Sequence, residues 1–96
     1  MHVISRKRLV QFWKKHPDAK GPLEAWFRRA RKAKWSKFAD VRADYPSADQ
    51  VKHFTVFNIG GNKYRLITVI HYNRSKVYIR AVLTHGDYDK GDWKND

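Results

Sequence analysis

The 96-residue chain predicts a single α+β domain in which helices come first and an antiparallel β-sheet follows. Apolar residues recur at helical spacing up to about residue 45 and at a period of two from about residue 53. The length suits one small domain, and the chain contains no internal repeat. We therefore expect one domain over residues 1–96. Residues 1–45 are mainly helical and basic, residues 50–89 form the sheet, and residues 90–96 are polar enough to fray.

The helical half begins with a short predicted strand at Val3–Ile4. Ser5 is a favourable N-cap, and the apolar residues after it recur at helical spacing until His16–Pro17 ends the pattern: Leu9, Val10, Phe12 and Trp13. Gly21–Pro22 interrupts the chain and starts a second helix, because proline fits the first helical turn. The apolar face of that helix is Leu23, Trp26, Phe27 and Ala30. A third, short helix is expected over Ser36–Tyr45, since Pro46 disfavours the helical conformation of the residue before it.

The second half alternates apolar and polar residues, as strands do. Three strands are predicted, over His53–Asn58, Lys63–Tyr72 and Lys76–Thr84. Gly60–Asn62 and Asn73–Arg74 are the turns between them. This order predicts an antiparallel meander.

The charge of the chain points to a polyanionic partner. Lys and Arg number 21 against nine acidic residues, which gives a net charge of +12 and a pI of about 10.2. Residues 1–38 carry a net +10, from 12 basic and two acidic residues. Nucleic acid is the first candidate partner, and four cations of the second helix are predicted to bind RNA: Arg28, Arg29, Arg31 and Lys32. The alternative is that these residues form the solvated face of an amphipathic helix.

Several classes of site are excluded or disfavoured. The chain has no Cys, so disulfides, thiolate zinc sites and cysteine nucleophiles are excluded, and a cytoplasmic location is the default expectation. The five His residues lack paired metal-ligand spacing, and we expect neither a metal nor a cofactor. The longest uncharged aliphatic stretch of the second half, Leu66–Ile70, is too short to span a bilayer, so no membrane partner is expected.

The predicted strand register brings two arginines together. With a two-residue turn at Asn73–Arg74, Ile67 faces Arg80 and Arg65 faces Val82, so the arginines are diagonal neighbours on one face. Neighbouring guanidinium groups repel each other unless an anion lies between them, which favours a phosphate site. The alternative is that polar residues simply solvate the outer face of the sheet.

The same register adds residues from the end of the last strand. Lys63 and Arg65 begin their strand where Thr84 and His85 end the next one, and Tyr88 can fold back over them. RNA is cleaved without a metal when its 2′-hydroxyl attacks the adjacent phosphate, provided that protons are transferred and the charge is stabilised. His85 and Tyr88 are the candidates for proton transfer.

The second half, moreover, resembles the HigB toxins of bacterial type II toxin-antitoxin systems, which belong to the RelE-like ribonuclease superfamily. Three ordered motifs carry the resemblance, and the first five residues, Met1–Ser5, agree with it. The motifs are Val56–Ile67 (VFNIGGNKYRLI), Tyr78–Arg80 (YIR) and Thr84–Asp89 (THGDYD).

The resemblance implies two N-terminal helices packed on a curved antiparallel sheet. It implies an mRNA endonuclease that acts in the ribosomal A site and is neutralised by a HigA-type helix-turn-helix antitoxin. Operator DNA would be bound only by the toxin-antitoxin complex. Arg65 would contact the scissile phosphate, Arg80 would be the second cation, and His85 and Tyr88 would transfer protons. Lys63 and Lys52 are plausible RNA-binding substitutes for the lysines of the RelE branch. The general base stays unassigned, and Asp89 either orients His85 or faces water.

Two other classes of function fit the same composition. The chain could be a noncatalytic nucleic-acid-binding module whose arginines only bind phosphate, which predicts salt-sensitive binding without cleavage. It could also be an interaction subunit that functions only with a partner.

Overall fold

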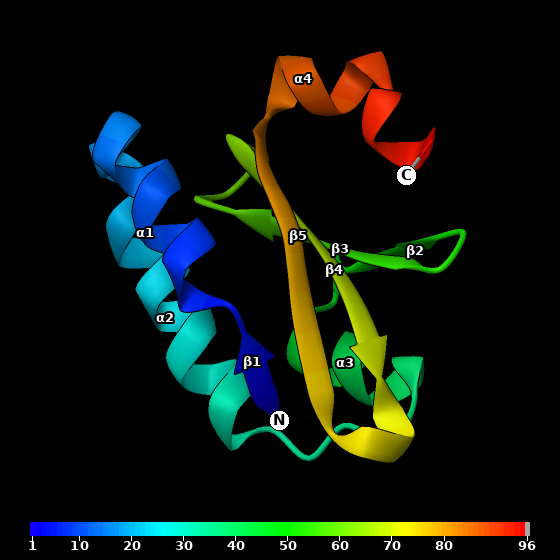
Figure 1. Ribbon diagram of the computed structural model, residues 1–96. Helices are drawn as coiled ribbons and strands as arrows, with labels where there is room; N and C mark the ends of the chain where they lie inside the picture. Colours follow the sequence, from blue (N-terminus) through cyan, green and yellow to red (C-terminus); the bar gives the residue numbers. More distant parts are fainter. Residues whose placement is uncertain (96) are drawn as a thin grey trace.

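A five-stranded sheet in the order β1-β5-β4-β3-β2 organises the protein, as seen in a computed structural model that describes residues 1–95 (Figure 1). The strands are β1 (His2–Ile4), β2 (Asp49–Val51), β3 (Phe54–Ile59), β4 (Tyr64–His71) and β5 (Lys76–Thr84). The α-helices are α1 (Arg6–Lys15), α2 (Lys20–Lys32), α3 (Phe38–Asp44) and α4 (His85–Lys90). Short 3₁₀ turns lie at Pro17–Ala19, Tyr72–Arg74 and Asp92–Asn95. The predicted α+β class is confirmed.

The sheet is mixed rather than wholly antiparallel. Strands β2 to β5 are antiparallel neighbours, which confirms the predicted meander, but β1 pairs with β5 in parallel. Strand β2 was not predicted. It pairs Val51 with Phe54 across a tight turn at Lys52 and His53, so His53 lies in a turn and not in the predicted strand. Three polar or half-buried residues give too short an alternation to reveal this strand in the sequence.

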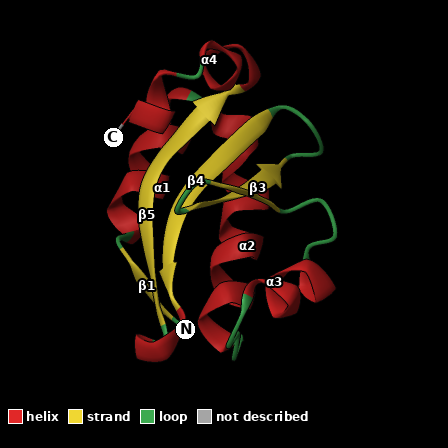
Figure 2. Ribbon diagram, turned by 90° about the vertical axis from the view of Figure 1, so that its right-hand side faces the viewer, coloured by secondary structure: helices red, strands yellow, loops and turns green. Residues whose placement is uncertain are grey.

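Helices α1, α2 and α3 supply the core on one side of the sheet, which we call the helix face (Figure 2). Helix α2 begins at Lys20, so Gly21 and Pro22 form its first turn instead of preceding it. The fully buried Phe57 of β3 lies at the centre of this core. Its ring is 5.3 Å from that of Trp26, 5.2 Å from that of Tyr45 and 6.0 Å from that of Trp35, measured between centroids. No helix within residues 1–95 combines the length and apolar character needed to cross a bilayer.

The opposite side, which we call the α4 face, has a smaller core of its own. Its buried residues are Phe54, Val56, Ile67 and Trp93. The Trp93 indole packs edge-on against Phe54 and donates a 2.9 Å hydrogen bond to the Tyr88 carbonyl. Residues 90–95 therefore do not form the expected frayed tail, because the indole buries apolar surface against the sheet. Asp96 lies outside the described residues.

A register shift in β5 alters the predicted pairing of the two longest strands. Next to the turn the register agrees with the prediction, but a bulge then shifts it by one residue. Ile67 pairs with Ala81 and Arg65 with Leu83, so the predicted pairs Ile67–Arg80 and Arg65–Val82 are wrong. Arg80 is the additional residue, and the strand changes faces there, since an unpaired residue reverses the alternation of side chains. Alternation alone gives no signal for such an insertion.

The aromatic cluster around Phe57 predicts a large loss of stability on truncation. Phe57→Ala should lower the free energy of unfolding by about 3–5 kcal/mol, because a fully buried ring leaves a cavity among three others. Phe57→Leu should cost clearly less. Urea unfolding measures both, and a Phe57→Ala midpoint within error of the parent protein would contradict the central position of this ring.

An ion pair at the start of β4 predicts acid-sensitive stability. The Tyr64 hydroxyl donates to Asp18 Oδ1 at 2.6 Å, and Lys63 Nζ lies 3.0 Å from Asp18 Oδ2. Both contacts, that of Tyr64 first, lower the pKa of the Asp18 carboxyl below its ordinary value of 3.8. A carboxyl with a lowered folded-state pKa stabilises the fold above its unfolded pKa and loses this contribution as the pH falls.

Asp18→Asn should therefore be less stable than the parent protein at pH 7, and the difference should shrink below about pH 4. Urea midpoints across this range test the sign. A difference that is constant with pH would show that the carboxylate charge contributes nothing.

Candidate active site

Arg65 of β4 is a nearly buried cation on the α4 face. Only 8% of the residue is exposed, and its guanidinium is bonded to backbone and amide oxygens rather than to a carboxylate. Nη2 donates to Asn62 Oδ1 at 2.6 Å, and Nη1 donates to the Asn62 and Tyr64 carbonyls at 3.1 and 3.2 Å. Three of the five guanidinium N–H groups are used in this way. These hydrogen bonds fix the orientation of the Arg65 guanidinium. No acidic group among residues 1–95 forms an ion pair with it.

The Tyr88 ring covers this guanidinium. Arg65 Cζ lies 5.3 Å from the centroid of the Tyr88 ring, and that ring is also stacked against Trp93, with 5.0 Å between ring centroids and an interplanar angle of 17°. Burial raises the pKa of the Tyr88 phenol above its ordinary value of 10, and the Asp49 carboxylate raises it further, while the Arg65 charge lowers it. The phenol therefore keeps its proton at neutral pH and can donate it.

His85 lies at the start of α4, directly after β5. Its backbone N–H donates to the Lys63 carbonyl at 3.1 Å, which confirms the predicted proximity of the two strand ends. The Thr84 hydroxyl caps the helix by accepting from the Asp87 N–H at 3.2 Å. His85 Nε2 lies 3.6 Å from Asp89 Oδ2, one helical turn further on. Both side chains are more than half exposed, at 51% and 61%, so the two alternatives for Asp89 stay open.

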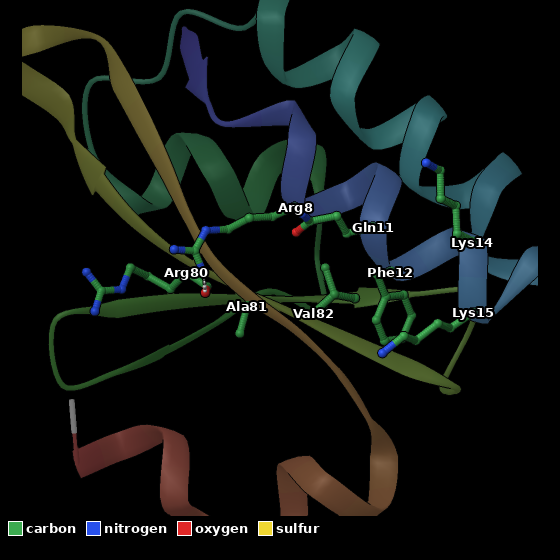
Figure 3. Close-up of a pocket in the computed structure, with 8 residues that line it drawn as sticks. All are labelled: Arg8, Gln11, Phe12, Lys14, Lys15, Arg80, Ala81 and Val82. Carbon is green, nitrogen blue, oxygen red and sulfur yellow. Dashed lines mark hydrogen bonds between the residues drawn. The ribbon is translucent and has the colours of Figure 1, made fainter.

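Arg80 lies apart from Arg65 because of the bulge. Leu83 is the strand partner of Arg65, and Arg80 lies three residues before Leu83. The backbone of Arg80 is therefore about 10 Å along the strand from the position opposite Arg65. Its backbone carbonyl accepts a 2.8 Å hydrogen bond from Arg8 of α1, and the two arginines line one groove between α1 and β5 (Figure 3). The predicted diagonal contact of Arg65 with Arg80 is therefore wrong.

The two predicted lysines lie at the edges of the α4 face. Lys63 Nζ is paired with Asp18 and is thereby directed away from Arg65. Lys52 occupies the β2–β3 turn with a positive φ of 56°, and its Nζ lies 3.4 Å from the Lys94 carbonyl. No hydrogen bond or ion pair joins either lysine side chain to Arg65 or Tyr88.

The four predicted cations of α2 belong to the other side of the molecule, since α2 packs on the helix face. Arg28, Arg31 and Lys32 line a shallow depression of about 300 Å³. Arg29 lies over the Tyr45 ring at 5.1 Å and pairs with Asp44 at 3.4 Å. They form a separate basic surface, which we call the α2 surface.

Sequence reasoning missed three residues of the site region. The sequence predicts Asn62 only as a turn residue, yet its carbonyl and amide oxygens accept two of the three hydrogen bonds of Arg65. The contact of Arg8 with Arg80 and that of Trp93 with Phe54 join residues far apart in the sequence, which periodicity does not reveal. A lone Trp in a polar segment was the available signal for Trp93.

The site thus combines a positioned cation, an imidazole beside a carboxylate, and a protonated phenol. These groups can bind a phosphate, accept a proton and donate one. Within residues 1–95, no three His, Asp or Glu side chains gather as metal ligands would.

Comparison with known proteins gives one consistent match. Residues 19–91 match the family model of the HigB toxin, the RelE-like toxic component of a toxin-antitoxin system. The mRNA interferase toxin HigB of Escherichia coli K12 is 36% identical over 92 residues, which cover 93% of this chain and 88% of that protein. An mRNA interferase HigB of Shigella flexneri matches equally, and one of Escherichia coli O6:H1 is 26% identical over 94% of this chain and 90% of its own.

Most of the chain is covered both by the family model and by relatives above 30% identity, and the α+β fold agrees with them. The chain belongs to the HigB toxin family, as the motifs of its second half predicted.

Proposed function

We propose that this protein is an mRNA interferase toxin that cleaves mRNA in the ribosomal A site, with Arg65, His85 and Tyr88 at the reaction centre. The observation that carries the proposal is the Arg65 guanidinium, which is nearly buried and lacks a carboxylate partner among residues 1–95. Such a charge is costly unless an anion binds it. The relatives named mRNA interferases suggest that the anion is a phosphate of mRNA.

The reaction we propose is a metal-independent transesterification. The 2′-oxygen of the RNA attacks the adjacent phosphorus and loses its proton to a base. The bond from phosphorus to the 5′-oxygen breaks, and that oxygen takes a proton from an acid. The products carry a 2′,3′-cyclic phosphate and a 5′-hydroxyl.

Each residue has a role that its surroundings support. His85 is the proposed base, because the Asp89 carboxylate 3.6 Å away would stabilise the imidazolium that forms. Tyr88 is the proposed acid, because its phenol carries a proton at neutral pH and its ring lies over the Arg65 guanidinium. Arg65 has two N–H groups beyond its three protein contacts, and these would bind the phosphate as its charge grows. Arg80 would bind a second phosphate of the same strand.

Ribosome dependence would use the α2 surface. Its cations lie on the helix face, away from the reaction centre, so ribosomal RNA could bind there while mRNA occupies the α4 face. Lys52 and Lys63, at the edges of the α4 face, would contribute further phosphate contacts. This function places the protein at translating ribosomes in the cytoplasm.

The family assignment also implies an antitoxin. We propose a HigA-type helix-turn-helix protein as partner, with operator DNA bound only by the complex of the two. The excess positive charge of the toxin would favour an acidic antitoxin surface.

Substitutions at the reaction centre separate chemistry from folding. His85→Gln and Tyr88→Phe should each reduce the cleavage rate by about 10²–10⁴-fold, since each removes a proton-transfer group. Arg65→Lys keeps the positive charge but loses the planar guanidinium and its several N–H donors. This variant should reduce the cleavage rate by about 10²–10³-fold. End mapping of a cleaved mRNA measures all three.

The matched control is Lys90→Gln, an exposed position on α4 outside the centre. It should cleave like the parent protein. Tyr88→Phe retains the ring that stacks on Arg65 and Trp93, so its urea midpoint should be unchanged. Full activity of a folded Tyr88→Phe or His85→Gln protein would refute the assigned role.

Ribosome dependence is tested with one mRNA, either free or on ribosomes paused at a defined codon. We expect new ends in the A-site codon of the ribosome-bound sample only. Cleavage of both samples would remove the ribosome from the mechanism. Salt-sensitive binding without new ends in either sample would instead support a noncatalytic nucleic-acid-binding module.

A further inference from the structure

A cavity on the α4 face lies outside the proposed reaction centre. Its volume is about 510 Å³, and it is bounded by the start of α1, the β2–β3 turn and the paired strands β4 and β5. The lining residues used below are Arg8, His53, Val69, His71, Tyr78 and Arg80. None of the nine lining residues is acidic. We call this cavity the Tyr78 pocket.

The wall of the pocket offers flat aromatic surface. Tyr78 is half-buried, and the His71 ring meets it edge-on, with 5.2 Å between ring centroids and an interplanar angle of 77°. Val69 pairs with Tyr78 across the strands, so its side chain lies beside the phenol on the same face. A planar, partly apolar ligand would stack on such a surface.

Two arginines adjoin this aromatic surface. Arg8 and Arg80 are both exposed, and within residues 1–95 neither forms an ion pair with a carboxylate. The hydrogen bond from Arg8 to the Arg80 carbonyl fixes Arg8 against β5 (Figure 3). Two unpaired guanidinium groups at one cavity favour an anion, and phosphate matches their geometry.

The pocket therefore suits a ligand with a flat ring and a phosphate, which describes a nucleotide. The pocket lies on the same face of β4 as Arg65. Arg65, Ile67 and the pocket residue Val69 are every second residue of that strand, and such residues point to the same face. Arg65 and Val69 are four residues apart, which corresponds to about 13 Å of extended strand, a span of a few nucleotides.

We propose that the Tyr78 pocket binds one nucleotide of the single-stranded RNA whose scissile phosphate lies at Arg65. The base stacks on Tyr78 beside His71, and its phosphate is bound by Arg8 and Arg80. The pocket selects and positions the message a few nucleotides from the cut. This inference rests on the proposed function, since it assumes that the RNA strand follows the α4 face.

The test measures binding directly, with an unstructured oligoribonucleotide in which 2′-O-methyl groups prevent cleavage. Tyr78→Ala and Arg8→Gln should each weaken binding about tenfold or more, by loss of a stacking surface or a phosphate contact. Tyr78→Phe should restore binding, because the ring is kept. Lys7→Gln is the matched control for Arg8, since it removes one charge from an exposed residue of α1 that does not line the pocket.

Two further readouts locate the effect. The slope of the logarithm of the binding constant against the logarithm of the salt concentration should become shallower by about one in Arg8→Gln, which corresponds to one lost phosphate contact. The slope should remain unchanged in Tyr78→Ala. In NMR spectra, adenosine 5′-monophosphate should shift the resonances of Tyr78 and His71. If Tyr78→Ala and Arg8→Gln bind the oligonucleotide like the parent protein, the inference is wrong. Binding of an acidic peptide but not of RNA in this pocket would also overturn it.

The inference and the proposed function fail differently. Loss of cleavage in His85→Gln together with unchanged RNA binding in Tyr78→Ala would leave the function standing and reject the pocket. Binding through the pocket by a protein that cleaves no RNA, free or on ribosomes, would support the pocket and reject the endonuclease.

Discussion

The requirement to bury apolar side chains on both faces of one sheet shapes this protein. Strand β5 meets it by changing faces at Arg80: Val77 and Ile79 join the helix-face core, whereas Ala81 and Leu83 pack on the α4 face. A regular strand would place all four on the same side. The bulge thus lets one continuous strand contribute to two cores, and it sets where the arginines of the α4 face lie.

How far the sequence predicts this structure depends on the distance over which each interaction acts. Local signals sufficed for α1 and for the Gly60–Asn62 turn, whose glycines adopt positive φ. The parallel pairing of β1 and the bulge depend on contacts between distant segments, which no periodicity reveals. The bulge therefore separates Arg80 from the predicted cluster. Tyr88 covers Arg65, and the His85 backbone is bonded to the Lys63 carbonyl, whereas the joint role of these residues stays a prediction.

The distribution of neutralising partners divides the basic residues into two kinds. Lys63, Arg28 and Arg29 have carboxylates within 4 Å, so part of their charge is compensated within the protein. Arg65 interacts instead with carbonyl and amide oxygens and an aromatic ring, which orient the guanidinium without cancelling its charge. The net charge of +12 attracts any polyanion, but only this second kind of site gives a phosphate a defined position.

The stack of Arg65, Tyr88 and Trp93 has an optical consequence. The Tyr88 ring lies against both the Arg65 guanidinium and the Trp93 indole, and the indole is 8% exposed. Trp26 and Trp35 are buried in the other core, on the far side of the sheet, and the half-buried Trp13 packs against that core as well. A displacement of the Tyr88 ring would therefore change the surroundings of Trp93 while leaving the other three indoles as they are. The emission of Trp93 is a natural fluorescent reporter of whether the guanidinium is covered.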